Sequence, residues 1–379
     1  MARKKILIVT TVPGTLSTIL KGQPRFLRGH FDTTLATSAG DSIESIRSAE
    51  GIDPTLVNMA RGISPIHDII SILKMILTIL KTRPDVVHSY TPKAGLVSML
   101  AAFICRVPVR IHTFTGLIFP TQEGLKQKLL ICIDRLICTC ATQIIPEGQG
   151  VKKDLLRFSI TRKPLGVIGH GNIAGVDTSH FDRNDQHIRI LSQHIQKTLP
   201  EQSFTFCFVG RINKDKGIYE LEKAFSRLPP NAHLLVAGGL DETAPVAKQT
   251  MENLKKNPRV HLLGFQEDIR PILLCSQVLV LPSYREGFPN VVLQAGAMNL
   301  PVIATDINGC NEVIEPDYNG WLVPPKATDA LYSAMLKAME TPVEDLAEMG
   351  RRARARIQDR FEQQDHWRRM ADFYKSQTA

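Results

Sequence analysis

The stretch S-Y-R-E-G-F-P-N-V-V-L-Q-A-G-A, residues 283–297, decides the fold of this chain. Two uncharged runs flank it, V-L-V-L-P at 278–282 and P-V-I-A-T at 301–305, and such runs are typical of buried parallel strands. Residues 291–297 are small and apolar, which predicts a helix that packs closely on a sheet. The stretch therefore predicts strand, turn, helix and strand within an α/β sheet.

Polar groups follow both predicted strands. Glu286 lies in the turn after the first strand, and the loop D-I-N-G-C-N, residues 306–311, follows the second. The carboxyl ends of parallel strands form the edge where open α/β sheets bind ligands. The helix that begins after Pro289 favours an anionic group such as a diphosphate at its start. The alternative is an ordinary strand–turn–helix with a surface glutamate.

The same alternation of strand and helix patterns runs through all 379 residues, a length that suits two domains. A Gly-rich segment, V-I-G-H-G-N-I-A-G-V-D at 167–177, is interpreted as the hinge between two halves, each a doubly wound parallel sheet. We expect strands at 6–10, 31–38, 86–89, 109–114, 143–146, 205–209, 233–237, 260–263, 278–282 and 301–305. Helices are expected at 18–27, 65–81, 91–105, 125–140, 151–158, 184–199, 219–228, 245–256, 327–341, 342–361 and 367–374.

Two cations follow the strand at 205–209. Arg211 and Lys216 lie on either side of a turn, where both can contact the phosphates of a nucleotide diphosphate through charge-assisted hydrogen bonds. The sequence contains no Asp-x-Asp triplet to hold a divalent ion, so we expect the cations to replace a metal and expect no cofactor. The alternative is two exposed basic residues in a loop.

The charge is unevenly distributed. Residues 1–180 contain 22 Lys and Arg against 12 Asp and Glu, net +10, whereas the remainder has 24 against 25, net −1. A basic first half suggests an anionic partner, such as anionic lipid, a lipid diphosphate or nucleic acid, or else a solvated basic surface. Nucleic acid is not expected, because no motif combines aromatic and basic residues.

Neither the cysteines nor the apolar runs indicate secretion or a membrane span. The seven cysteines have no metal-ligand spacing and are interpreted as reduced cytosolic thiols. Every long apolar run is interrupted by charge, as by Lys74, so no transmembrane helix is predicted. The short apolar run at 6–9 is interpreted as the first strand rather than as a signal peptide.

At residues 283–297 the chain resembles the donor-binding signature of the retaining family 4 glycosyltransferases. That signature is two glutamates separated by seven residues; Glu286 holds the first position, but Gln294 holds the second. In the family the first lies near the donor sugar and the second binds the nucleotide ribose. Glutamine keeps the length and a carbonyl acceptor but loses the charge. Residues 169–177, with 88–95 and 113–119, resemble the capsular and O-antigen polysaccharide glycosyltransferases of this family.

The resemblance implies a GT-B fold of two Rossmann-like domains that face each other across a cleft. The domains would be an acceptor-side domain at 1–175, a nucleotide-sugar-binding domain at 176–361 and a C-terminal helix at 362–379 that crosses back to the first domain. It implies catalytic roles for Glu286, Lys216, Arg211 and Thr115. Donor binding is implied for Gly14, Gly210, Arg211, Lys216, Gly238, Phe265, Ile269, Glu286, Gly287, Phe288, Pro289, Asn290 and Gln294.

Candidates for the acceptor side are His88, Lys93, His112 and His170. Many family members carry a histidine directly before the glycine that matches Gly116, but Thr115 holds that place here. His112 lies inside the strand, so the alternative for it is a buried histidine with satisfied hydrogen bonds. Lys93 opens a helix, where its charge opposes the helix dipole, which favours a ligand role.

The resemblance further implies retaining transfer, in which the leaving diphosphate itself takes the proton of the acceptor. The expected function is transfer from a nucleotide sugar, a UDP-sugar, to a sugar linked to polyprenyl diphosphate in surface polysaccharide biosynthesis. A GT-B nucleotide-sugar epimerase and a non-catalytic sugar-nucleotide-binding protein are the alternatives. The enzyme is expected in the cytoplasm, bound peripherally through its basic first domain to an anionic inner membrane face. The helices at 65–81 and 125–140 combine apolar stripes with basic residues, and each stripe is either core or membrane face.

Overall fold

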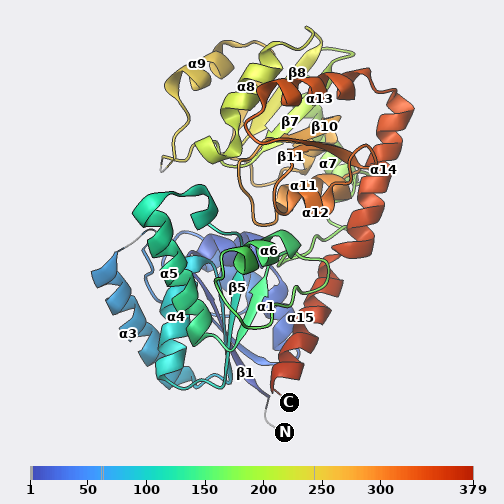
Figure 1. The fold of residues 1–379 in the computed structure, drawn as a ribbon. Coiled ribbons are helices and arrows are strands. Elements are labelled where there is room, and N and C mark those ends of the chain that lie inside the picture. The colour runs from blue at the N-terminus through green and yellow to red at the C-terminus, as the bar shows by residue number, and fades with distance from the viewer. Residues whose placement is uncertain (1–2, 61, 63, 243, 379) are drawn as a thin grey trace. The chain divides into compact units, whose positions relative to one another are not determined.

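The computed structural model describes residues 3–60, 62, 64–242 and 244–378. The chain divides into two compact units (Figure 1). The first unit comprises residues 1–175 together with 363–379, and the second comprises residues 176–362.

The first unit contains a six-stranded parallel sheet in the order β3-β2-β1-β4-β5-β6. The central strand β1 pairs with β2 on one side and with β4 on the other, so that Ile8 lies opposite Leu35 of β2 and His88 of β4. The strands are β1 (Lys5–Thr10), β2 (Asp32–Thr37), β3 (Thr55–Leu56), β4 (Val86–Tyr90), β5 (Val109–Phe114) and β6 (Gln143–Pro146).

Helices cover both faces of this sheet because successive strand residues point to opposite sides. Ile6 and Ile8 pack on one side with residues of α1, α2 and α15, whereas Leu7 and Val9 pack on the other with residues of α3, α4, α5 and α6. The helices are α1 (Gln23–Arg28), α2 (Ile43–Glu50), α3 (Pro65–Thr82), α4 (Pro92–Ile104), α5 (Gly124–Cys140), α6 (Gln149–Arg157) and α15 (Gln363–Thr378). The last of these, from the end of the chain, packs beside α1 (Figure 1).

The second unit repeats the design around one core, with strand order β12-β11-β10-β7-β8-β9. The strands are β7 (Phe204–Val209), β8 (Ala232–Ala237), β9 (Val260–Gly264), β10 (Val278–Leu281), β11 (Val302–Thr305) and β12 (Gly320–Val323). The helices are α7 (Gln186–Gln196), α8 (Ile218–Ser226), α9 (Lys248–Lys256), α10 (Arg270–Leu274), α11 (Asn290–Ala297), α12 (Cys310–Val313), α13 (Thr328–Glu340) and α14 (Val343–Arg360). The prediction of two doubly wound parallel sheets is confirmed.

The boundaries differ from the predicted ones where short elements interrupt a pattern. The helix predicted over 18–27 is a π-helical turn, η1 (Thr15–Ile19), followed by α1, because Gly22 adopts a left-handed backbone and Pro24 begins a new helix. Helix α2 and the two-residue strand β3 were not predicted. A two-residue strand is too short to produce a hydrophobic period.

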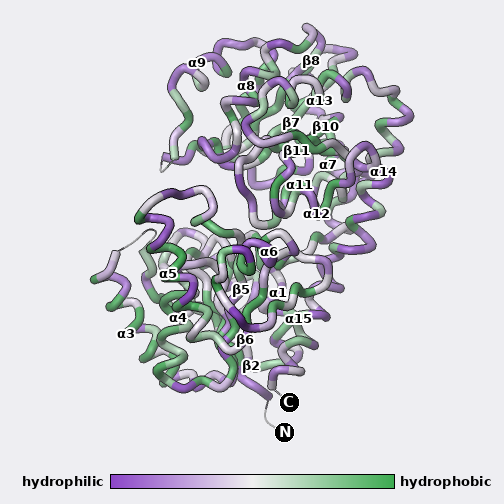
Figure 2. The backbone as a smooth tube through the Cα atoms, viewed as in Figure 1, coloured by the Kyte–Doolittle hydropathy of each residue, from purple (hydrophilic) through white to green (hydrophobic). Residues whose placement is uncertain are grey.

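The apolar stripe of helix α3 was interpreted from the sequence as either protein core or membrane face, and the structure shows that it does not face the core. Six of its large apolar side chains are exposed, although Met75 and Ile79 are buried, and Figure 2 shows the helix as a largely hydrophobic segment at the margin of the first unit. The residues that α3 buries include Asp68, Ser71 and Thr78. The interpretation of this stripe as protein core is therefore wrong.

Candidate functional site

The two predicted polar loops of the second unit lie against each other. Gly309, in the loop after β11, adopts a left-handed backbone, and a Cβ there would lie 2.4 Å from the carbonyl oxygen of Gly287. Only a glycine permits this approach. A hydrogen bond also connects the two segments, since Thr305 at the end of β11 donates to the carbonyl oxygen of Ser283. The segment 283–297 and the loop 306–311 therefore form one surface.

Lys216 and Glu286 meet at this surface although they are 70 residues apart in the chain. Lys216 ends the short 3₁₀ helix η3 (Lys214–Lys216) after β7, and the Asn213 side chain accepts a hydrogen bond from its backbone N–H at 3.1 Å. Its Nζ lies 2.5 Å from Glu286 Oε1, and the two side chains are only 20% and 12% exposed. Removing one partner of an ion pair this far from solvent would destabilise the protein, because the other charge would stay buried without a partner.

Arg211 lies in the same loop but has a different partner. Its Nη1 donates to Oδ2 of Asp241 at 2.5 Å, and Asn213 donates to the same oxygen at 3.1 Å. The Arg211 side chain is 64% exposed, whereas that of Asp241 is nearly buried. The alternative of two exposed basic residues therefore describes Arg211 but not Lys216.

Asp241 was not singled out from the sequence, and neither was the ion pair between Asp215 and Arg285 at 2.8 Å. Both pairs hold the loops around Lys216 in place. The sequence feature that could have identified Asp241 is its position directly after G-G-L at 238–240, because this loop follows the carboxyl end of β8.

A buried thiol lies beside the Lys216–Glu286 pair. Cys310 begins α12 and is completely buried. Burial, together with the negative charge of Glu286, holds the pKa of this thiol well above its usual value. Cys310 is therefore neutral and is not activated as a nucleophile.

Gln294 lies on α11, one turn after Asn290 at the helix start. It is half-buried, and its side-chain amide has no hydrogen-bond partner among the described residues. Phe288 and Pro289, which lead into α11, are buried and support the turn. The amide of Gln294 is thus available to a ligand at the helix that follows Glu286.

The turns after β7, β8 and β9 form the other side of this edge. The backbone N–H of Gly210 donates to Ala237 O at 2.9 Å and that of Gly238 to Gly264 O at 2.8 Å, so the three strand ends are tied together. Phe265 follows this turn with 79% of its surface exposed. Ile269, at the start of α10, is half-buried. An exposed aromatic ring at this position suits stacking on a nucleotide base.

In the first unit the corresponding edge contains a strained threonine. Thr91, between β4 and α4, has φ +77°, which is rare for a β-branched residue. Its hydroxyl lies 2.6 Å from that of Thr11, which also accepts the N–H of Ala94 at 3.1 Å. Such strain concentrates at functional sites. Gly14, by contrast, has an ordinary φ of −55° and nothing near its missing Cβ.

His88 and His112 are completely buried. The ring nitrogens of His88 lie 2.5 Å from the hydroxyl of Tyr374 and 2.7 Å from that of Thr113, and burial holds its pKa well below the usual value. His112 contacts Ser89 through Nδ1 at 2.8 Å, and burial lowers its pKa to about 3. Burial favours structural roles for both histidines, although Nε2 of His112 has no hydrogen-bond partner among the described residues, and the acceptor roles stay predictions.

Lys93 forms an ion pair with Asp68, a pairing that was not predicted from the sequence. Its Nζ lies 2.7 Å from both carboxylate oxygens of Asp68 on α3, and both side chains are largely buried. The pair offsets the unfavourable helix dipole, so the dipole argument for a ligand role of Lys93 no longer holds. Thr115 is half-buried after β5, and His170 lies exposed in the segment before β7.

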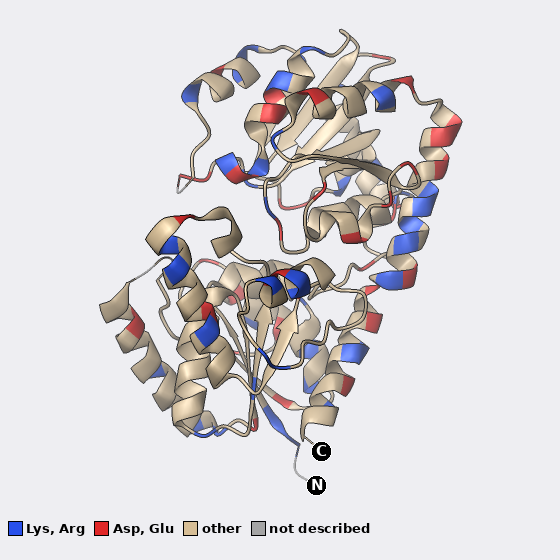
Figure 3. Cartoon of the chain, viewed as in Figure 1, with Lys and Arg blue, Asp and Glu red and all other residues tan. Residues whose placement is uncertain are grey.

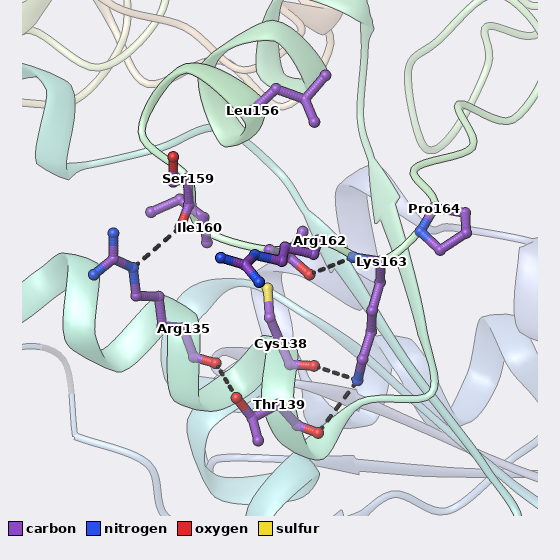
Figure 4. A pocket seen from close by; sticks show the side chains of 10 residues that line it. Arg135, Cys138, Thr139, Leu156, Ser159, Ile160, Arg162, Lys163 and Pro164 are labelled. Carbon is purple, nitrogen blue, oxygen red and sulfur yellow. Dashed lines mark hydrogen bonds between the residues drawn. The ribbon is translucent and has the colours of Figure 1, made fainter.

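A separate pocket in the first unit lies between α5 and the segment that follows α6 (Figure 4). It is basic, and two of its cations, Lys163 and Arg135, have partners in the chain. Lys163 donates to the carbonyl oxygens of Cys138 and Thr139 at the end of α5, and Arg135 donates to that of Ser159. We therefore interpret Lys163 and Arg135 as residues that connect α5 to the segment after α6.

The fold of this chain is similar to that of solved glycosyltransferase structures. The chain superposes with a TM-score of 0.81 on Anabaena HepE in complex with UDP, at 19% identity, covering 98% of this chain and all of HepE. Sucrose-phosphate synthase from Thermosynechococcus elongatus gives 0.80 at 20% identity, with 99% of each chain covered. The two units thus have the GT-B glycosyltransferase architecture.

The family follows from the sequence. Residues 191–356 match the model described as glycosyl transferases group 1, and residues 27–171 match the glycosyl transferase 4-like domain. The chain belongs to this glycosyltransferase family. It is 30% identical to the capsular polysaccharide biosynthesis glycosyltransferase CapM of Staphylococcus aureus, over 99% of this chain and 98% of CapM. It is 29% identical to an Escherichia coli UDP-Gal:α-D-GlcNAc-diphosphoundecaprenol α-1,3-galactosyltransferase, covering 81% and 79%.

The described residues contain no group of three or more His, Cys, Asp or Glu placed to hold a metal ion. None of their helices combines the length and apolar character needed to cross a bilayer.

Proposed function

We propose that this chain transfers a sugar, with retention of configuration, from a UDP-sugar to a sugar linked to polyprenyl diphosphate in surface polysaccharide biosynthesis. The Lys216–Glu286 pair carries the proposal, since it presents a cation and a carboxylate together at the carboxyl edge of the second sheet. The printed names of the relatives support the rest. CapM is named for capsule biosynthesis, and the Escherichia coli relative for a UDP-galactose donor and a diphosphoundecaprenol acceptor.

In the proposed reaction, the bond between the anomeric carbon and the donor phosphate oxygen breaks. The acceptor hydroxyl oxygen bonds to that carbon on the same face, and the released diphosphate oxygen takes the acceptor's proton. Negative charge therefore grows on the diphosphate during transfer. An ammonium group donates several hydrogen bonds, so Lys216 keeps Glu286 while it contacts phosphate and stabilises this charge. No metal and no cofactor are needed for this step.

The other predicted residues have distinct roles in the proposal. Arg211 leaves Asp241 for the phosphates, which its exposure permits. Glu286 accepts hydroxyls of the donor sugar, and Gln294 accepts a ribose hydroxyl. Phe265 stacks on the base beside Ile269. Further donor contacts are assigned to Gly210, Gly238 and the segment 287–290.

We assign donor binding to residues 176–361 and acceptor binding to residues 1–175, with 362–379 returning to the first domain. On the acceptor side we retain Thr115 and His170 as candidates and add Thr91, because of its strained backbone. A lipid-linked acceptor with a UDP-sugar donor places the enzyme in the cytoplasm at the inner membrane face.

Ligand binding without turnover tests the donor half of the proposal. In a thermal-shift series with UDP, GDP and ADP, each alone and as glucose conjugates, UDP and its conjugate should raise the melting temperature. The Lys216→Ala variant should lose most of that shift. A shift by GDP or ADP but not by UDP would exclude the uridine donor, and no shift with any nucleotide would overturn the donor site.

A further inference from the structure

Helix α3 presents an apolar stripe to solvent along its whole length. Its members recur at the i, i+3, i+4 and i+7 positions of a helix, which places them on one side. Each side chain is between 47% and 74% exposed: Ile66, Ile69, Ile70, Leu73, Leu77 and Leu80. A contiguous apolar face of this size on a water-soluble surface indicates an interaction site.

Polar contacts on the opposite side of α3 fix this orientation. Asp68 forms the largely buried ion pair with Lys93 of α4. Ser71 donates to the carbonyl oxygen of Asn58 at 2.5 Å and lies 2.7 Å from that of His67. Rolling the helix to bury its apolar stripe would break the ion pair and these hydrogen bonds. The outward apolar face is therefore built into the unit.

The charged residues around the stripe are basic. Lys74, Lys81 and Arg83 are exposed, whereas the only acidic residue of α3, Asp68, is buried and paired. The same helical layer continues through α4 to α5, which begins with exposed Leu125, and basic positions are visible along α5 (Figure 3).

We propose that the outward face of α3 lies in the interface of an anionic lipid bilayer, with the helix in the membrane plane. This inference rests on the proposed function, in which the acceptor stays in the membrane, and it names the surface that brings the enzyme there. A helix of 18 residues is about 27 Å long. The apolar stripe inserts between the head groups, and the lysines contact anionic lipid.

The charge distribution favours lipid over a second copy of the chain. A symmetric contact between two α3 helices would bring Lys74, which lies near the middle of the helix, toward Lys74 of the other copy whether the helices run parallel or antiparallel. Like charges at such an interface repel, whereas an anionic surface attracts all of them. A membrane satisfies both the apolar and the basic groups with one partner.

Sedimentation with vesicles of phosphatidylcholine, with and without phosphatidylglycerol, tests the proposal on the full chain without substrate. Wild type should pellet with the anionic vesicles at low salt, less at high salt, and not with phosphatidylcholine alone. Leu73→Glu with Leu77→Glu should weaken this binding at least about tenfold, as should Lys74→Glu with Lys81→Glu. Matched controls in the second unit, Ile190→Glu with Leu191→Glu and Lys255→Glu with Lys256→Glu, should bind like wild type.

Several outcomes would overturn the proposal. One is equal binding by the α3 variants and their controls. Another is a lipid-free wild-type dimer, in analytical ultracentrifugation, that Leu73→Glu with Leu77→Glu dissociates, because a second copy would then cover α3. Transfer to a short-chain, water-soluble acceptor separates this inference from the proposed function. Variants that lose vesicle binding should keep that activity, whereas absent transfer beside intact vesicle binding counts only against the function.

Discussion

Lys216 and Glu286 form the ion pair on which the proposed chemistry depends, and both stability and catalysis draw on it. The pair is short and mostly withdrawn from water. Removing one member leaves a carboxylate or an ammonium group in an environment that solvates it poorly. Substitutions here therefore need a control that separates lost chemistry from lost folding.

Lys216→Ala should lower turnover by about 10²–10³, as removal of a donor to a developing oxyanion does in other enzymes. Lys214→Ala, in the same 3₁₀ turn but exposed, should keep wild-type turnover. The double variant Lys216→Ala with Glu286→Gln should regain thermal stability but not activity. Wild-type turnover in folded Lys216→Ala would remove the lysine from the mechanism.

Gln294 should tolerate a return to the family's acidic residue. Gln294→Glu should bind the nucleotide donor at least as tightly as wild type, because a carboxylate accepts stronger hydrogen bonds from a ribose. Gln294→Ala should raise the donor Kd by about 2–10-fold, the effect of one neutral hydrogen bond. Calorimetric titration measures both changes. Unchanged affinity in the alanine variant would show that the amide does not contact the nucleotide.

Asp134 on α5 gives the first unit a pH-dependent stability. Burial raises its pKa to about 7, so the folded state holds a proton that the unfolded state releases near pH 4. Its contribution to the free energy of unfolding should therefore fall between about pH 4 and pH 7 and stay constant above that. Asp134→Asn should be more stable than wild type at pH 8, by up to about 4 kcal/mol, and equally stable near pH 3. A difference that does not change with pH would contradict the raised pKa.

At the scale of elements, α3 and α4 are joined by the Asp68–Lys93 pair. Lys93→Met should destabilise the protein by about 3–5 kcal/mol, because it leaves Asp68 buried without its partner. Adding Asp68→Asn should recover most of that loss in chemical denaturation. If Lys93 served the acceptor instead, Lys93→Met would lower activity and leave the unfolding midpoint unchanged.

The strand and helix patterns of both units were predictable because most of the buried strands are uncharged runs between turns. The rotation of α3 was not, since its periodicity is the same whether the stripe faces the core or solvent. Asp68 and Ser71 decide that rotation through partners distant in the chain, Lys93 and Asn58. The break between η1 and α1 likewise depends on packing around Gly22 rather than on local preference.

The candidate site was predictable to a similar degree. Lys216 and Glu286 were both proposed from motifs, but their direct contact was not, because nothing local records a pairing across 70 residues. The burial of His88 and His112 was not predictable for the same reason. The sequence pattern around a histidine near a strand end is the same whether its ring faces a ligand or the interior. Here His88 contacts Tyr374 and His112 contacts Ser89, both in the interior.

At the scale of the whole molecule, the two units differ in charge as they differ in proposed task. The basic excess lies in residues 1–180, net +10 against −1 for the remainder, and the apolar face of α3 lies in that same half. The second unit carries the paired cation and carboxylate at a strand edge. Donor chemistry and membrane attachment are thus assigned to separate parts of one chain.

The measurement that tests the central claim most directly is acceptor-dependent transfer followed by NMR of the product. The purified enzyme is incubated, in excess chelator, with UDP-sugars and a short-chain prenyl-diphosphate-linked sugar. The account predicts UDP and a new glycoside whose anomeric configuration matches that of the donor, formed only when acceptor is present. An inverted product would contradict retention, and complete loss of activity restored by Mg²⁺ would contradict metal-free transfer. Free sugar released without acceptor would indicate an epimerase, and donor binding without any product would indicate a non-catalytic protein.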